Sequence, residues 1–229
     1  MSFGDEAGEL DALIRRVDPD RWLTSRFIAD AEARIDVLAL YAFDHELARA
    51  RRAVSTPLMA EIRLTWWREA LDEIFQGRAA RRHPTAEALS AAAARRGLPR
   101  APLDAMIDGQ IDILEANTLD ASAALRWADQ VHGSAAGLAA QTLGGRPEHA
   151  APAGRVWGLA QAVRAGLIGA EAVRPLLAEA LAAARQAARQ LPAAAFPAAL
   201  PARLAAMGGA PGPLARRITL ILAVASGRL

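Results

Sequence analysis

The chain has 229 residues, of which 53% are hydrophobic and 23% charged, a composition typical of a folded globular protein rather than a disordered one. It contains no cysteine, which excludes disulfides, thiolate metal sites and cysteine nucleophiles. It also contains no lysine, so the pI of 10.2 beside a net charge of +2 reflects arginine as the only strong base. The high pI is therefore no sign of a nucleic-acid partner.

The charge is distributed unevenly along the chain. Residues 1–150 carry 18 arginines against 23 acidic residues, and residues 151–229 carry 9 against 2. The basic last third could contact acidic lipid or an acidic protein, or it could pack against the acidic part of the chain. The N-terminus lacks a signal-peptide core, and no apolar run approaches the roughly 20 residues that span a bilayer. We therefore expect a cytoplasmic protein, with a peripheral contact at the inner membrane left open.

Helical periodicity, helix caps and helix breakers follow one another along the whole chain, and no stretch alternates with the period of a β-strand. We predict an all-α, single-domain helical bundle over residues 1–229, with residues 1–8 flexible. The expected helices are 9–17, a segment from about 20 that runs into 35–52, 57 to about 77, 85–96, 103–116, 121–143, 155–164, 171–190, 200–207 and 213–226.

Two consecutive helices, joined at residues 55–57, carry charged residues within their apolar faces. On a helical wheel, Asp44 and Arg51 share the inward face of the first helix. Arg63 lies in the middle of the apolar arc of the second, and a buried guanidinium without a partner costs several kcal/mol. We therefore predict that Arg63 is buried and paired with a carboxylate, Asp44 being the first candidate.

Asp104, Asp108 and Asp112 recur every four residues along one predicted helix. Carboxylates at this spacing repel one another, and facing arginines or a divalent cation would reverse that repulsion. Two interpretations remain open: a solvated or arginine-paired face, and a Mg²⁺ site that holds a diphosphate.

The five tryptophans are either core residues or the wall of a large apolar pocket, and a helical wheel does not separate the two interpretations.

The triplet Tyr-Ala-Phe at residues 41–43 and the block Arg-x-x-Trp-Trp at residues 63–67 resemble the squalene/phytoene synthase family. The segments 103–115 and 133–143 fall at the expected places further on. The resemblance covers residues 17–145 and implies an all-α fold of isoprenoid-synthase type. In that family, two aspartate-rich motifs on facing helices bind magnesium and the diphosphates of two prenyl substrates.

The resemblance also implies that both acidic motifs are missing. The aspartates of the first motif would fall at Ala48, Arg49 and Arg52, and neither alanine nor arginine offers an oxygen ligand to a metal. The second motif would lie around residues 156–164, but residues 149–170 contain no acidic side chain.

The chain is more similar to the family's non-synthase branch, the assembly factors of respiratory complex I. That branch shares the run Ala-Phe-x-x-Glu-Leu-Ala at residues 42–48 and the Val-Ser start of the next helix at 54–55, and it lacks the acidic motifs. Asp44 departs from the asparagine expected there, and the C-terminal part looks shortened at residues 164–169.

We therefore expect a catalytically inactive family member without a cofactor, which binds a protein partner or a lipid-like ligand, with complex I assembly as one setting. One alternative is a divergent prenyl-diphosphate transferase of isoprenoid biosynthesis, using Mg²⁺ and the aspartate ladder. Another is a scaffold bundle without a ligand. The candidate pocket residues are Tyr41, Asp44, His45, Ala48, Arg52, Arg63 and Trp67.

Overall fold

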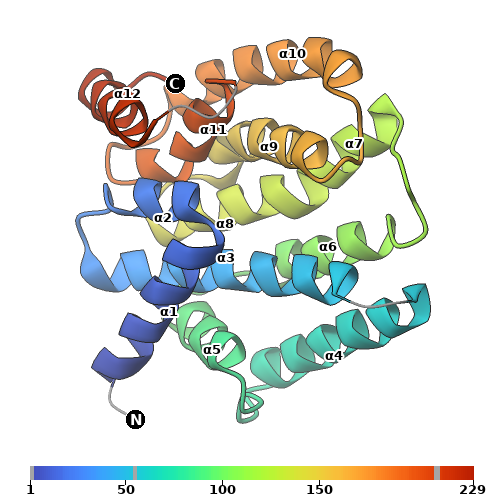
Figure 1. Ribbon diagram of the computed structural model, residues 1–229. Helices are drawn as coiled ribbons and strands as arrows, with labels where there is room; N and C mark the ends of the chain where they lie inside the picture. The colour runs from blue at the N-terminus through green and yellow to red at the C-terminus, as the bar shows by residue number, and fades with distance from the viewer. Residues whose placement is uncertain (1–2, 54–55, 209–211) are drawn as a thin grey trace.

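The chain folds into a bundle of helices, shown in Figure 1, and no strand occurs in the part that is described. The computed structural model describes residues 3–53, 56–208 and 212–229, with side chains from residue 7 onward. In chain order the elements are α1 (Phe3–Val17), α2 (Pro19–Ser25), α3 (Ala31–Arg52), α4 (Pro57–Phe75), α5 (Pro84–Arg96), α6 (Arg100–Ile111), α7 (Ala121–Trp127), a π-helical turn η1 (Ala128–Gly133), α8 (Ser134–Thr142), α9 (Pro147–Arg164), α10 (Ala170–Ala188), a 3₁₀ turn η2 (Phe196–Ala198), α11 (Leu200–Ala205) and α12 (Pro213–Ser226). The predicted all-α class is confirmed.

Helix α3 runs through the centre of the bundle. Its first turn is capped by Asp30, whose carboxylate accepts a hydrogen bond from the amide of Ala33 at 2.8 Å. Residues 36–44 are all buried, because α1, α2, α4, α5, α6 and α8 surround this stretch. A charged side chain in this stretch therefore needs a partner from a neighbouring helix.

Helix α4 lies at the edge of the bundle in Figure 1, where it packs against α3 and α6. It begins as predicted, with the Thr56 hydroxyl accepting a hydrogen bond from the amide of Met59 and Pro57 in the first turn. Only a narrow stripe of its surface is buried. That stripe consists of Ala60, Leu64, Trp67, Ala70 and Leu71.

The prediction that Arg63 is buried and paired with Asp44 is wrong. Arg63 is exposed, and its guanidinium donates a hydrogen bond of 3.4 Å to the carbonyl of Ala53. The apolar arc of α4 is wider than the surface that α3 and α6 cover, so Ile62 beside it is also exposed, at 54%. Asp44 obtains its partners from other helices.

The predicted helix 121–143 is interrupted by the π-helical turn η1, against which α9 packs closely. A Cβ atom at Gly154 would lie 2.1 Å from the carbonyl oxygen of His132, and one at Gly158 would lie 2.8 Å from the ring of His132. Only glycine allows this approach, because real Cβ atoms do not tolerate contacts under 3.0 Å. The two glycines thus hold α9 against the segment that carries His132.

Several helix boundaries differ from the prediction. Helix α6 begins at Arg100 and ends at Ile111, earlier than expected at both ends, and α1 begins at Phe3 rather than Glu9. Helix α9 begins at Pro147 because its second proline, Pro152, is accommodated inside the helix. No helix in the described ranges is long and apolar enough to cross a membrane.

Candidate functional site

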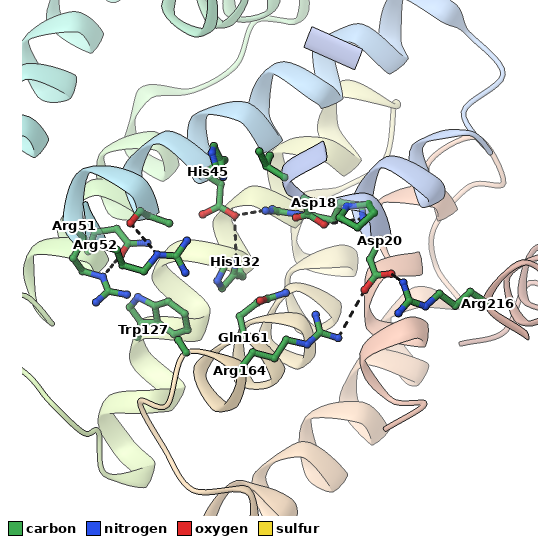
Figure 2. Close-up of a pocket in the computed structure, with 17 residues that line it drawn as sticks. Asp18, Asp20, His45, Arg51, Arg52, Trp127, His132, Gln161, Arg164 and Arg216 are labelled. Carbon is green, nitrogen blue, oxygen red and sulfur yellow. Dashed lines mark hydrogen bonds and ion pairs between the residues drawn. The ribbon is translucent and has the colours of Figure 1, made fainter. Parts of the chain in front are cut away.

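A cavity of about 430 Å³ lies between α2, α3, α6, η1, α9 and α12, as Figure 2 shows. This size is within the usual range of small-molecule sites. The charged residues that line it, histidines aside, are Asp18, Asp20, Arg21, Asp44, Arg51, Arg52, Arg164 and Arg216. Five arginines therefore face three aspartates, which leaves an excess of two positive charges before any histidine is counted.

Asp44 on α3 forms the buried part of the site. One of its oxygens lies 2.7 Å from the guanidinium of Arg21 on α2 and 3.3 Å from Nδ1 of His132 on η1. Burial alone would raise the pKa of Asp44, but the charges of His132 and Arg21 and their hydrogen bonds hold it well below its usual range. Asp44 is therefore ionised, and the charge of Arg21 balances its own.

Arg21 is held by more than this one carboxylate. It also pairs with Asp18, and its guanidinium lies over the ring of Tyr41, 4.6 Å from the ring centroid. Burial raises the pKa of Tyr41 to about 12, against the opposing effect of the Arg21 charge. Tyr41 thus positions Arg21 from behind the cavity and remains a neutral phenol.

Arg51 and Arg52, at the end of α3, lie on one side of the cavity and lack an acidic partner among the described residues (Figure 2). Arg51 donates to the side-chain carbonyl of Gln110 at 3.0 Å, and Arg52 donates to the backbone carbonyl of Ala48 at 3.3 Å. Burial and the neighbouring charge of Arg52 lower the pKa of Arg51. An anion bound beside them would relieve this repulsion.

On the other side of the cavity, Arg164 and Arg216 share a single carboxylate. Asp20 lies 2.8 Å from Arg216 of α12 and 3.8 Å from Arg164 at the end of α9 (Figure 2). Asp20 thus links the ends of α9 and α12 on this side of the cavity.

Two buried ring nitrogens complete the polar lining. Nε1 of Trp127 and Nε2 of His132 have no hydrogen-bond partner among the described residues, although their side chains are 4% and 7% exposed. The indole N–H of Trp127 is a donor, and an unsatisfied buried donor is destabilising by about 1–3 kcal/mol, which a bound acceptor would remove. The arginines and the Trp127 N–H together describe a site for an anion with several oxygen atoms.

The family profile of squalene/phytoene synthases matches residues 14–165, more than half of the chain. This protein belongs to the squalene/phytoene synthase family. A dehydrosqualene synthase solved in complex with a ligand is similar in structure, with a TM-score of 0.72 and 14% identity, over 97% of this chain and 96% of that one. Squalene synthase HpnC from Alicyclobacillus acidocaldarius gives a TM-score of 0.70 and 16% identity, over 97% and 94%. No curated protein matches the sequence.

These neighbours show the isoprenoid-synthase type of fold that the resemblance predicted. Helix α9 ends at Arg164, where the sequence looked shortened. Because the chain still matches nearly the full length of both neighbours, that shortening is a small part of the fold.

The structure brings together four of the seven pocket residues expected from the sequence. Asp44, His45, Ala48 and Arg52 line the cavity, and burial lowers the pKa of the half-buried His45. Tyr41 lies behind it.

The remaining two candidates lie elsewhere. Arg63 and Trp67 line a separate shallow depression beside Glu46 and His83. Trp67 is a core residue, packed edge-on against Phe43 with 5.4 Å between ring centroids.

Sequence reasoning missed most of the cavity. Arg21, His132 and Arg216 carried no motif, and Gln161 was not distinguished from other residues of its helix. The local signal was the placement of Asp44 and Arg51 on the inward face of their helix.

The aspartate ladder of α6 lies outside this cavity. Asp108 pairs with Arg68 at 2.5 Å, Asp104 pairs with Arg100 at 2.8 Å, and Asp112 accepts a hydrogen bond from Gln130. Each carboxylate thus has a protein partner that a metal ion would have to displace.

The donor set of the cavity does not fit a magnesium–diphosphate centre. Ala48 and Arg52 occupy the α3 side and Gln161 and Arg164 the α9 side, while Arg49 is exposed and pairs with Glu46 outside it. The three aspartates present are each paired with arginine. In the described ranges, no group of three or more acidic, histidine or cysteine side chains is arranged to hold a metal.

Proposed function

We propose that this protein is a catalytically inactive member of the squalene/phytoene synthase family that binds an anionic, lipid-like ligand directly through arginine, without a metal ion. One observation supports the proposal. The family's chemistry needs facing acidic side chains on α3 and α9. The cavity between these helices is lined instead by side chains without a carboxylate, namely Ala48, Arg52, Gln161 and Arg164. A metal ion polarises a phosphoryl leaving group in a way that a guanidinium alone does not reproduce.

The chemistry of the ligand follows from the lining. Guanidinium groups bind phosphate in a forked geometry, and pairs of them on both sides of the cavity suit a phosphate or a diphosphate. The prenyl chains of the family's substrates supply the lipid-like part of this proposal.

If the protein binds a protein partner, we propose that it acts in the assembly of respiratory complex I. This role is supported by the run shared at residues 42–48 and by the absence of acidic motifs; the Val-Ser pair at 54–55 lies outside the described residues. Deletion of the gene in its host should reduce the amount of intact complex I on native gels. Unchanged complex I would contradict this role while leaving ligand binding untouched.

Ligand binding is tested by calorimetry with farnesyl diphosphate, in EDTA and again in Mg²⁺. We expect binding in EDTA, no gain with Mg²⁺ and no coupled product. Arg51→Gln with Arg52→Gln should weaken binding by about tenfold or more, because one or two charge-assisted hydrogen bonds to the ligand are lost. Arg63→Gln, an exposed arginine outside the cavity, is the matched control.

Two results would contradict the proposal. One is binding that requires Mg²⁺. The other is conversion of farnesyl diphosphate to a coupled product, which would support the transferase alternative, especially if Asp108→Asn abolished it.

A further inference from the structure

Helix α12 has apolar side chains on two opposite faces. Leu220 and Ala223 are buried against the bundle, where α12 packs on α11. The other face consists of Leu214, Ile218, Ile221 and Leu222, which are 71%, 47%, 55% and 62% exposed. These positions follow the i, i+4, i+7, i+8 spacing of one helical face. Since monomeric proteins seldom expose such a continuous apolar patch, this face indicates an interaction surface.

The surroundings of this face are strongly basic. Residues 180–229 contain six arginines and no acidic residue. On α12 itself, Arg216 turns inward to Asp20, whereas Arg217 is exposed, as is Arg228 just beyond the helix. The partner of this surface is therefore negatively charged as well as able to accept apolar side chains.

The shape of the surface favours a lipid bilayer over a protein. Helix α12 has 14 residues, hence a length of about 21 Å, and Figure 1 places it at the outer edge of the bundle. A stable protein interface needs roughly 800 Å² from each partner. The exposed face of a single 14-residue helix offers less than this area. A second copy packed on the same face would also bring Arg217 and Arg228 of both chains together.

We propose that α12 is a membrane-docking helix that lies in the plane of an anionic bilayer. Leu214, Ile218, Ile221 and Leu222 insert between the lipid headgroups, and Arg217 and Arg228 contact the lipid phosphates. The four apolar side chains lie outside the cavity lining, and this proposal does not rest on the proposed function.

The test is co-flotation of the full chain with vesicles of phosphatidylcholine alone or with phosphatidylglycerol. We expect binding to the anionic vesicles only, weakening as salt is raised. Ile221→Asp with Leu222→Asp should reduce binding about tenfold or more, since apolar area is lost and negative charge is added. Leu58→Asp with Ile62→Asp, at 65% and 54% exposed positions of α4, is the matched control that keeps binding.

Folding and ligand binding are monitored separately. All four substituted side chains are about half exposed or more, so both variants should keep the melting temperature of the wild type. Arg51→Gln with Arg52→Gln should bind vesicles normally, which separates this proposal from the cavity.

Three results would overturn the proposal. The first is no binding of the wild-type chain to anionic vesicles. The second is an equal loss in the α4 control. The third is a dimer in analytical ultracentrifugation that Ile221→Asp with Leu222→Asp dissociates, which would assign the face to a second copy.

Discussion

The guanidinium of Arg21 lies 2.7 Å from the carboxylate of Asp44, joining α2 to the central helix, and His132 reaches the same oxygen from η1. This ion pair is almost fully buried, so its integrity matters more for stability than that of a surface pair. It also fixes Arg21 and His132 at the wall of the cavity.

Asp44→Asn should therefore be strongly destabilising. The substitution leaves the buried Arg21 with Asp18 as its one remaining carboxylate, and we expect a loss of about 3 kcal/mol in the free energy of unfolding, measured by urea denaturation at neutral pH. Asp108→Asn, which breaks a half-exposed pair with Arg68, should change it by less than about 1 kcal/mol. Equal effects of the two substitutions would contradict the role of Asp44.

The same carboxylate should shape the pH dependence of stability. Its pKa in the folded protein is below the ordinary value of 3.8, so its contribution is complete above that pH and is lost as the pH falls towards the folded pKa. From about pH 5 to about pH 3, the wild type should lose stability more steeply than Asp44→Asn. Parallel curves would show that Asp44 is not the titrating group.

The contact between α9 and η1 predicts a second kind of sensitivity. Gly154→Ala would place a methyl group against the carbonyl of His132, and overpacking of this type costs about 1–3 kcal/mol, so the melting temperature should fall. Gly8→Ala, in a helix position with nothing within 4 Å, is the control and should not lower it. A Gly154→Ala protein as stable as the wild type would mean that the helices lie farther apart.

Arg52 should lower the stability of the protein while it strengthens diphosphate binding. Arg52→Gln removes a charge that repels Arg51, so we expect a melting temperature higher by about 1–2 °C together with weaker diphosphate binding. Arg81→Gln removes an arginine paired with Glu69 and Glu73 and should have the opposite effect on the melting temperature. A lower melting temperature for Arg52→Gln would show that its charge is compensated.

Oxygen donors can be returned to the cavity as a direct test of their absence. Ala48→Asp with Arg52→Asp places two carboxylates one turn apart on α3, facing α9. Millimolar Mg²⁺ should then raise the melting temperature by about 2 °C or more, while the wild type stays unaffected. A wild type that responds to Mg²⁺ would contradict metal-free binding.

Local chemistry predicted the helices well where caps and breakers stand in the sequence. Thr56 and Pro57 start α4, and Gly97 ends α5 in the left-handed conformation that glycine favours. The π-helical turn was not predictable in this way, because it contains no proline and its one glycine, Gly133, lies inside a helix that continues as α8.

The cavity was harder to predict, because it is assembled from residues distant in the chain. Asp20 and Arg216 are 196 positions apart and share no motif. The error at Arg63 has a related cause: a helical wheel gives the width of an apolar arc but not how much of it neighbouring helices will cover. Ala48 and Arg52 were found because the family's motif marked their positions.

Asp20 connects the two proposals energetically. It contacts Arg164 at the cavity and Arg216 on α12. An anion that binds Arg164 in place of Asp20 therefore changes the ion pair between Asp20 and Arg216. Thermodynamic reciprocity then applies to the two sites. A ligand in the cavity changes the affinity of α12 for its partner by the same factor by which that partner changes the affinity of the cavity for the ligand.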